Sequence, residues 1–280
     1  VSFGDLRIDD DWILDALYNE PLRIRSYLAH NLWLEIHQPH YLDIKPFAKA
    51  GADVIFVEVF LNGKYNGVYI LSEQVDKKQL QIQGYNGMIR GELYKAINWG
   101  GACTFDWLPS YTNSSRLWGG YEYKIPDESE VTNWDELYNF TDFVINSSTS
   151  DFKEDIWNRF NKENAMDYYI YLNLIRAEDN TGKNIFMGKI DVGESYFYTP
   201  WDLDACFGTD WKGENDTKTN NILTNGFFRR SYAYNAGGFK TDVGNRWHAY
   251  RNNILSTESL ETFFDHAYNT LINNNVYDRE

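Results

Sequence analysis

The segment "ADVIFVEVFLNGKYNGVYILSEQVD", residues 52–76, restricts the fold of this chain more than any other part of the sequence. Two runs rich in β-branched and aromatic residues, 54–61 and 67–75, flank the polar piece "NGKYN". An Asn-Gly pair between two such runs is a strong hairpin signal, because both residue types tolerate the positive φ of a tight turn. The segment therefore predicts two antiparallel strands early in the chain.

Two more segments before residue 126 have strand character, "GELYKAI" at 91–97 and "GYEYKI" at 120–125. The Gly-, Ser- and Asn-rich piece between them, about 98–118, predicts a loop.

Residues 9–36, ahead of the hairpin, are predicted to be helical. The acidic residues 9–11 suit a helix N-terminus, and Pro21 suits the start of a second helix. Leu28, Leu32 and Ile36 then form one apolar stripe at helical spacing.

The pattern becomes helical from Asn133 onward. "TNWDELYNFTDFVIN" begins with Thr132 or Asn133 as a cap, and Asp135 and Glu136 follow in its first turn. "NKENAMDYYIYLNLIRA" predicts a long buried helix. "NIFMGK" and "SYFYTPWD" are predicted to pair as a second hairpin across "IDVGE", and the C-terminal part is mainly helical.

Strand signals thus dominate the first part of the chain and helix signals the second, without an alternating βα rhythm. This distribution predicts an α+β fold in two lobes, a strand-rich lobe over residues 1–128 and a mainly helical lobe over 129–280. Both would belong to a single domain.

The formal net charge of −15 disfavours nonspecific binding to nucleic acid or anionic lipid, because the phosphates would be repelled. It does not exclude a nucleotide, whose charge can be neutralised locally by Mg²⁺ and basic residues. Cys103 and Cys206 are compatible with one disulfide or with two free thiols, and they form no zinc motif. No apolar run has the length of a transmembrane helix. The chain begins at Val1, which is typical of a fragment or a mature chain, so a removed signal peptide stays an open alternative.

The stretch "RAEDNTGKNIFM" places Asp179 and Asn184 five residues apart at the two ends of a polar turn. Asp and Asn favour turns for local reasons, so an ordinary turn explains the pair equally well. In a catalytic loop, the same spacing lets an acid face the substrate while the amide oxygen faces a metal ion. Carboxylate and amide oxygens are the hard ligands that Mg²⁺ prefers.

The order of segments around this turn is that of protein kinases. A Gly-containing hairpin comes first, then a strand with a central Lys95, a buried helix, the turn itself, a short hairpin and Asp202. The motifs depart from typical kinases, because Ala177-Glu178 precedes Asp179 and the later acid lies in Asp202-Leu203-Asp204.

The pieces "LNGKYNGVYILSEQVDKK", "GELYKA", "YEYKIP", "KNIFMGK" and "YFYTPWDLDACFG" together resemble the CotH kinase-like family, the spore-coat protein group and its relatives. The resemblance covers most of the chain, from about Trp12 to about Leu260. "NGVYILSEQVD" and "PWDLD" are its most specific parts. The abrupt start predicts that the earliest part of the domain is missing.

The resemblance implies an atypical protein-kinase fold that uses ATP and Mg²⁺ or Mn²⁺ to phosphorylate Ser or Thr of secreted, surface or spore-coat-type proteins. It implies that Asp179 is the catalytic aspartate and that Asp202 binds the metal. Asn184 then fits the second metal ligand, and Asp204 assists or caps the following turn.

Three further residues are candidates for nucleotide binding. Lys95 is the first choice for the phosphate-binding lysine, and Lys124 in "YEYK" is its rival. Glu73 would orient Lys95 by an ion pair, although it precedes Lys95 in the chain. Lys95 has the alternative of being an exposed strand residue. Lys183, beside Asn184, would stabilise the transferring phosphoryl group or be solvated, and the solvated interpretation is favoured.

Two other functions stay open. One is a kinase-fold module that binds nucleotide or serves as a scaffold without turnover. The other is a glycan-binding or carbohydrate-active surface protein, suggested by the aromatic content of 17% and by acid pairs such as Asp202 and Asp204. Location at the cell or spore surface or outside the cell follows from the family resemblance only, and the sequence leaves the oligomeric state open.

Overall fold

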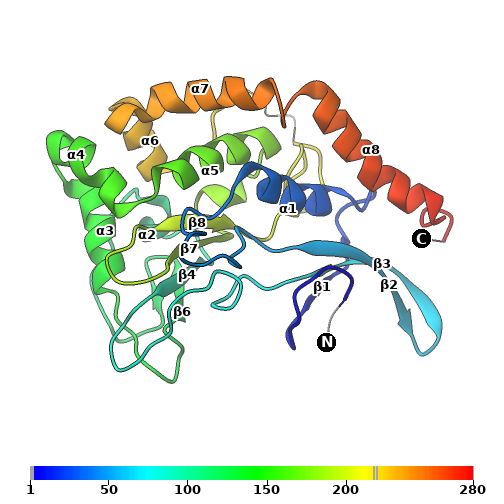
Figure 1. Ribbon diagram of the computed structural model, residues 1–280, viewed down its shortest axis with the longest axis horizontal. Coiled ribbons are helices and arrows are strands. Elements are labelled where there is room, and N and C mark those ends of the chain that lie inside the picture. Colours follow the sequence, from blue (N-terminus) through cyan, green and yellow to red (C-terminus); the bar gives the residue numbers. More distant parts are fainter. Residues whose placement is uncertain (1–2, 217, 219, 280) are drawn as a thin grey trace.

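The computed structural model describes residues 3–216, 218 and 220–279. Its strands fall into two antiparallel sheets (Figure 1). The strand bounds are β1 Ile13–Asp15, β2 Val54–Leu61, β3 Lys64–Ser72, β4 Glu92–Ala96, β5 Leu117–Trp118, β6 Tyr121–Ile125, β7 Ile185–Lys189 and β8 Phe197–Pro200. The smaller sheet has the order β1-β3-β2, and the larger has the order β5-β6-β4-β7-β8.

The helices lie mostly in the second half of the chain, as predicted. Their bounds are α1 Arg25–Ile36, α2 Gly101–Thr104, α3 Asp135–Asn146, α4 Thr149–Arg159, α5 Lys162–Ile175, α6 Gly226–Ala233, α7 Phe239–Arg251 and α8 Thr257–Asn273, with 3₁₀ turns at Asp179–Thr181 and Ala236–Gly238. Figure 1 shows α5 and α7 stacked above the larger sheet, while α8 runs down toward the β2–β3 hairpin.

The first predicted hairpin is confirmed, with a tighter turn than the flanking runs suggested. Leu61 pairs with Lys64, so only Asn62 and Gly63 form the turn. Both have positive φ, 52° and 76°, as a two-residue hairpin turn of this kind requires. β3 therefore begins at Lys64, before the predicted residue 67. The second hairpin is also confirmed, because β7 and β8 pair antiparallel.

The predicted helix over residues 9–24 is wrong. Ile13 to Asp15 form β1, which pairs with β3 at the edge of the smaller sheet. Asp9 caps no helix, because its carboxylate lies 2.8 Å from the Lys78 ammonium. The helix starts only at Arg25, after the Glu20 carboxylate accepts the backbone N–H of Ile24 at 2.7 Å. Within α1 the predicted stripe of Leu28, Leu32 and Ile36 is buried.

The strands 91–97 and 120–125 are confirmed as β4 and β6, and the loop between them contains the short α2 and β5. The helix predicted after Asn133 is α3, whose N-terminal Asp135 donates its backbone N–H to the Asn133 side chain at 2.8 Å.

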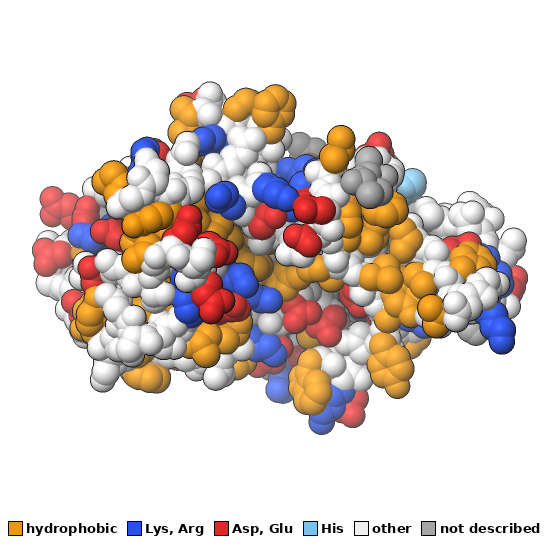
Figure 2. Space-filling view, turned by 90° about the horizontal axis from the view of Figure 1, so that it is seen from below, with side chains coloured by type: hydrophobic (Ala, Val, Ile, Leu, Met, Phe, Trp, Pro, Cys, Tyr) orange, Lys and Arg blue, Asp and Glu red, His pale blue; other side chains and the backbone are white. Residues whose placement is uncertain are grey.

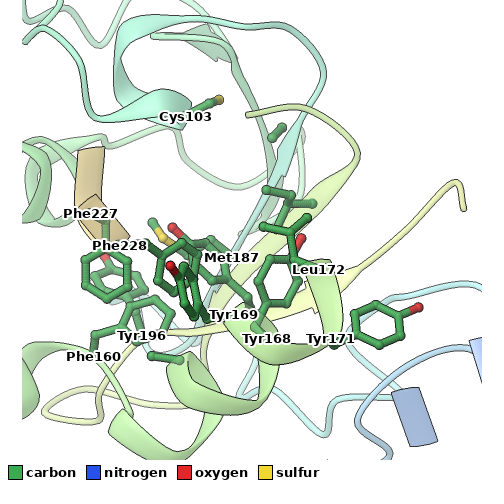
Figure 3. Packing of buried hydrophobic residues seen from close by; sticks show 14 of the residues in the cluster. Cys103, Phe160, Tyr168, Tyr169, Tyr171, Leu172, Met187, Tyr196, Phe227 and Phe228 are labelled. Atoms are coloured by element: carbon green, nitrogen blue, oxygen red, sulfur yellow. The ribbon is translucent and has the colours of Figure 1, made fainter. Parts of the chain in front are cut away.

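The main core lies between the larger sheet and the helices. Figure 3 shows Tyr168 and Tyr171 of α5 together with Met187 of β7 and Phe227 and Phe228 of α6. On the opposite face of the sheet, Leu93, Phe186 and Phe197 of the strands form a smaller buried apolar cluster with residues from the loops. The larger sheet is therefore covered on both faces.

The mixture of helices and antiparallel sheets agrees with the predicted α+β class. The larger sheet takes β4, β5 and β6 from the first part of the chain and β7 and β8 from the second. Strands thus occur on both sides of the boundary near residue 128, and the division into two kinase-like lobes stays a prediction.

Acidic and basic side chains are interspersed across the middle of the face in Figure 2, with apolar patches between them. Among the described residues, no helix combines the length and apolarity needed to cross a membrane. Cys103 and Cys206 are both buried free thiols.

Candidate active site

The turn after α5 is built from its own backbone and one ion pair. α5 ends at Ile175, and its C-cap residue Arg176 lies in the left-handed region, with φ of 60°. The carbonyl of Asp179 then accepts the N–H groups of Gly182 at 3.2 Å and Lys183 at 2.9 Å. The Lys183 ammonium reaches back to the Asp179 carboxylate at 2.9 Å. The lysine that sequence reasoning favoured as solvated is thus paired with the candidate catalytic acid.

Asn184 and Asp202 approach each other across the β7–β8 hairpin. The Asn184 carbonyl accepts the N–H of Trp201 at 3.1 Å, and the Asn184 amide nitrogen lies 3.5 Å from the Asp202 carbonyl oxygen. Both residues have positive φ, 56° for Asn184 and 53° for Asp202. Asn and Asp adopt this region more readily than other non-glycine residues, which explains their fit at these two bends.

Asp202 is an exposed residue, and in the described part of the chain its carboxylate accepts no hydrogen bond and forms no ion pair. The protein atoms around the carboxylate reduce its hydration and so raise its pKa, and the negative charges of Asp15 and Asp179 raise it further. The positive charges of Lys183 and Lys95 act in the opposite direction. The turn, β4 and β1 therefore all contribute charges to the surroundings of Asp202.

Asp204 supports the acidic side of the site. Burial and the neighbouring Asp202 charge raise the pKa of Asp204 to about 6. The side-chain amide of Asn19 donates to the Asp204 carboxylate at 2.9 Å. Asp15 is the last residue of β1, and Asn19 lies in the connection between β1 and α1. Sequence reasoning missed both because residues 9–24 were expected to be helical.

Lys95 lies on β4 opposite Glu122 and Phe186. Its ammonium lies 5.8 Å from the ring centroids of both Phe186 and Trp201, a geometry typical of cation–π contact. No ion pair to Lys95 is formed within the described residues. Its charge lowers the pKa of Asp202, which places Lys95 in the same electrostatic environment.

Glu73 does not pair with Lys95, and this expectation is wrong. The Glu73 side chain is 0% exposed, and its carboxylate lies 2.8 Å from the Lys49 ammonium. The backbone N–H of Arg7 and the Gln79 amide donate to the same carboxylate at 2.7 and 3.2 Å. Lys49 comes just before β2, so the register of the smaller sheet brings it to the end of β3.

Lys124 forms an ion pair with Glu122 at 3.1 Å, and its side chain is 43% exposed. It lines a pocket of about 230 Å³ together with Asp76, Asp127 and Glu130. It is not among the charges that act most strongly on Asp202. The charge of Lys95 therefore acts more strongly on the candidate metal ligand Asp202 than the charge of Lys124 does.

The residues at the site fit a magnesium–nucleotide complex better than a metal held by protein alone. Within residues 3–216, 218 and 220–279, no three His, Cys, Asp or Glu side chains form a metal-binding group. Mg²⁺ in nucleotide sites typically takes one or two protein ligands and completes its shell with phosphates and water. The unpaired Asp202 carboxylate would supply such a partial set together with the Asn184 side chain, whose nitrogen lies 3.5 Å from the Asp202 backbone carbonyl oxygen.

A comparison with protein-family models matches residues 2–279 to the family described as CotH kinase protein. The match spans nearly the whole chain and exceeds the limits of the sequence resemblance. No curated protein matches the chain.

Proposed function

Because this chain belongs to the CotH kinase protein family, we propose that it is an ATP- and divalent-metal-dependent protein kinase. Its substrates would be Ser or Thr hydroxyls of secreted, surface or spore-coat-type proteins. The observation that supports this proposal best is the unpaired, solvent-accessible Asp202 carboxylate, which shares its surroundings with Asn184, Asp179 and two lysines.

Asp202 and Asn184 would hold the metal ion, with Asp204 behind them. When bound, Mg²⁺ supplies positive charge to the β- and γ-phosphates. The carboxylate and the amide oxygen would fix the position of the nucleotide relative to the turn. Lys95, whose ammonium lies 5.8 Å from the ring centroids of Phe186 and Trp201, would bind a phosphate oxygen.

Asp179 would act on the substrate hydroxyl. Its carboxylate accepts the proton while the hydroxyl oxygen bonds to the γ-phosphorus and the bond from that phosphorus to the bridging oxygen breaks. ADP leaves with the electron pair of the broken bond. Lys183, now 2.9 Å from Asp179, would turn toward the phosphoryl group as it transfers, because its flexible stem allows both positions.

The ion pair between Lys183 and Asp179 also favours one alternative, a nucleotide-binding module without turnover. In that case Lys183 would keep its ion pair with Asp179 after ATP binds. Calorimetry and transfer assays on the same protein separate the two functions, because the module binds Mg²⁺-ATP but transfers nothing.

Labelled ATP, Mg²⁺ or Mn²⁺ and a Ser/Thr-containing protein test the proposal. Asp179→Ala should lower the transfer rate by about 10²- to 10⁴-fold, the usual contribution of a positioned base. Glu178→Ala is the matched control, because it removes an exposed acid from the same turn. Absence of transfer by the wild-type chain, or equal rates for both variants, would contradict the proposal.

A further inference from the structure

A buried amide connects the two segments that carry the candidate metal residues. Asn180 is 2% exposed and lies inside the 3₁₀ turn Asp179–Thr181. Its side-chain nitrogen donates to the carbonyl of Asn184 at 2.7 Å and to the carbonyl of Trp201 at 2.8 Å. One side chain thus joins the end of the turn to the end of β8.

Both accepting carbonyls lie next to the atoms that would meet the metal. The Asn184 carbonyl belongs to one candidate ligand, and the Trp201 carbonyl belongs to the peptide group that leads into Asp202. Asn184 and Asp202 both have positive φ, so their side-chain directions depend on how these peptide groups are held. The two bonds from Asn180 hold both peptide groups at once.

Two hydrogen bonds from helical elements fix the turn that carries Asn180. The hydroxyl of buried Tyr168 on α5 donates to the Asn180 carbonyl at 2.9 Å. The Asn225 side chain, at the N-cap of α6, donates to the Thr181 carbonyl at 3.1 Å. The position of Asn180 is therefore fixed, because its own carbonyl and that of the next residue accept hydrogen bonds from α5 and from the N-cap of α6.

We infer that Asn180 is a positioning residue that sets the separation and orientation of Asn184 and Asp202 for the metal–nucleotide complex. This inference rests on the proposed function. Outer hydrogen-bond partners of metal ligands commonly change metal affinity or activity by about 10- to 100-fold when they are removed. An ordinary turn asparagine would affect stability but not the metal requirement.

The test compares Asn180→Ala and the milder Asn180→Ser with Asn164→Ala. Asn164 is the matched control because its buried side chain also joins two elements, bonding the Tyr198 N–H at 2.7 Å and carbonyl at 2.9 Å. Two quantities are measured for each protein. One is the Mg²⁺ concentration that gives half-maximal transfer, and the other is the rise in unfolding midpoint caused by Mn²⁺ plus ADP.

We expect Asn180→Ala to raise the half-saturating Mg²⁺ concentration by at least about 10-fold and to reduce the stabilisation by Mn²⁺ and ADP. Asn180→Ser, which keeps one donor, should shift in the same direction by less. Asn164→Ala should lose thermal stability while keeping the wild-type metal requirement.

An active wild-type chain together with an unchanged metal requirement in the folded Asn180→Ala variant overturns the inference alone. If Asn180→Ala does not fold, an unchanged requirement in Asn180→Ser overturns it instead. A wild-type chain with neither transfer nor metal–nucleotide stabilisation refutes the proposed function, and the inference with it.

Discussion

Replacing Glu73 by Ala tests whether its carboxylate holds the fold together before any nucleotide binds. The substitution removes a fully buried acceptor that serves the Lys49 ammonium, the Arg7 backbone N–H and the Gln79 amide. Breaking a buried ion pair by deleting one partner costs about 3–5 kcal/mol. Lys49 keeps its second partner, Asp53, so the lower end of the range, about 3 kcal/mol, is expected.

The assay is equilibrium unfolding in urea, followed by tryptophan fluorescence without nucleotide. Glu73→Gln keeps the volume and one acceptor oxygen, so it should lose only about 1–2 kcal/mol. Glu58→Ala is the matched control, because Glu58 on β2 of the smaller sheet forms a partly exposed ion pair with Arg279 near the C-terminus. Exposed pairs contribute about 0–1 kcal/mol, so this control should stay near wild type.

A free energy of unfolding for Glu73→Ala within about 1 kcal/mol of wild type would refute the reasoning. If the same variant lost Mg²⁺-ATP affinity, Glu73 would be a nucleotide residue whose bond to Lys49 matters little. If stability falls as expected, any loss of affinity must be compared at equal folded fraction.

Three other outcomes are expected. Burial and Asp202 raise the pKa of Asp204 to about 6, so the folded state disfavours its charge and the contribution of this carboxyl to stability falls as pH rises from about 4 to about 6. Asp204→Asn should remove this fall when urea midpoints are compared at the two ends of the window, and an unchanged slope would contradict it. Gly63→Ala should cost about 1 kcal/mol in thermal unfolding, because φ is 76° and an added Cβ meets no atom within 4 Å; a larger loss would mean that the turn itself reorganises. Lys95→Met should raise the KM for ATP about tenfold, whereas Lys124→Met should not, and the reverse result would exchange their roles.

The parts of the fold that sequence predicts well depend on local rules. Asn62 and Gly63 fix a two-residue turn because both adopt positive φ, so the hairpin follows from two residues. The error over residues 9–24 has a long-range cause. Asp9 satisfies its charge with Lys78 rather than with a helix end, and the 13–15 strand adds to β3 near its C-terminal end. Neither contact can be predicted from the residues that are neighbours of 9–24 in the sequence.

In the candidate site, too, sequence predicts what depends on local rules and misses what depends on long-range contacts. Chain order and spacing point to Asp179, Asn184 and Asp202, and the structure brings their segments together, although their roles stay predictions. The partner of Glu73 was misjudged because its pairing depends on sheet register. Asn180 lies inside the quoted turn, yet its importance depends on two carbonyls whose directions only the folded backbone sets. The sequence signal that would have drawn attention to it is an asparagine placed between two candidate site residues, an acid and an amide, in one short turn.

The position of β7 in the larger sheet links completion of the fold to assembly of the site. β4 pairs with β6 on one side and with β7 on the other, so during synthesis one edge of β4 stays open until residues 185–189 emerge. An open edge is prone to pairing with other chains. Asn184, the residue just before β7, donates its N–H to Ala96 at the end of β4 at 2.9 Å. The strand that closes this edge therefore also brings Asn184 into place, so the candidate site is assembled only after the larger sheet has closed around β4.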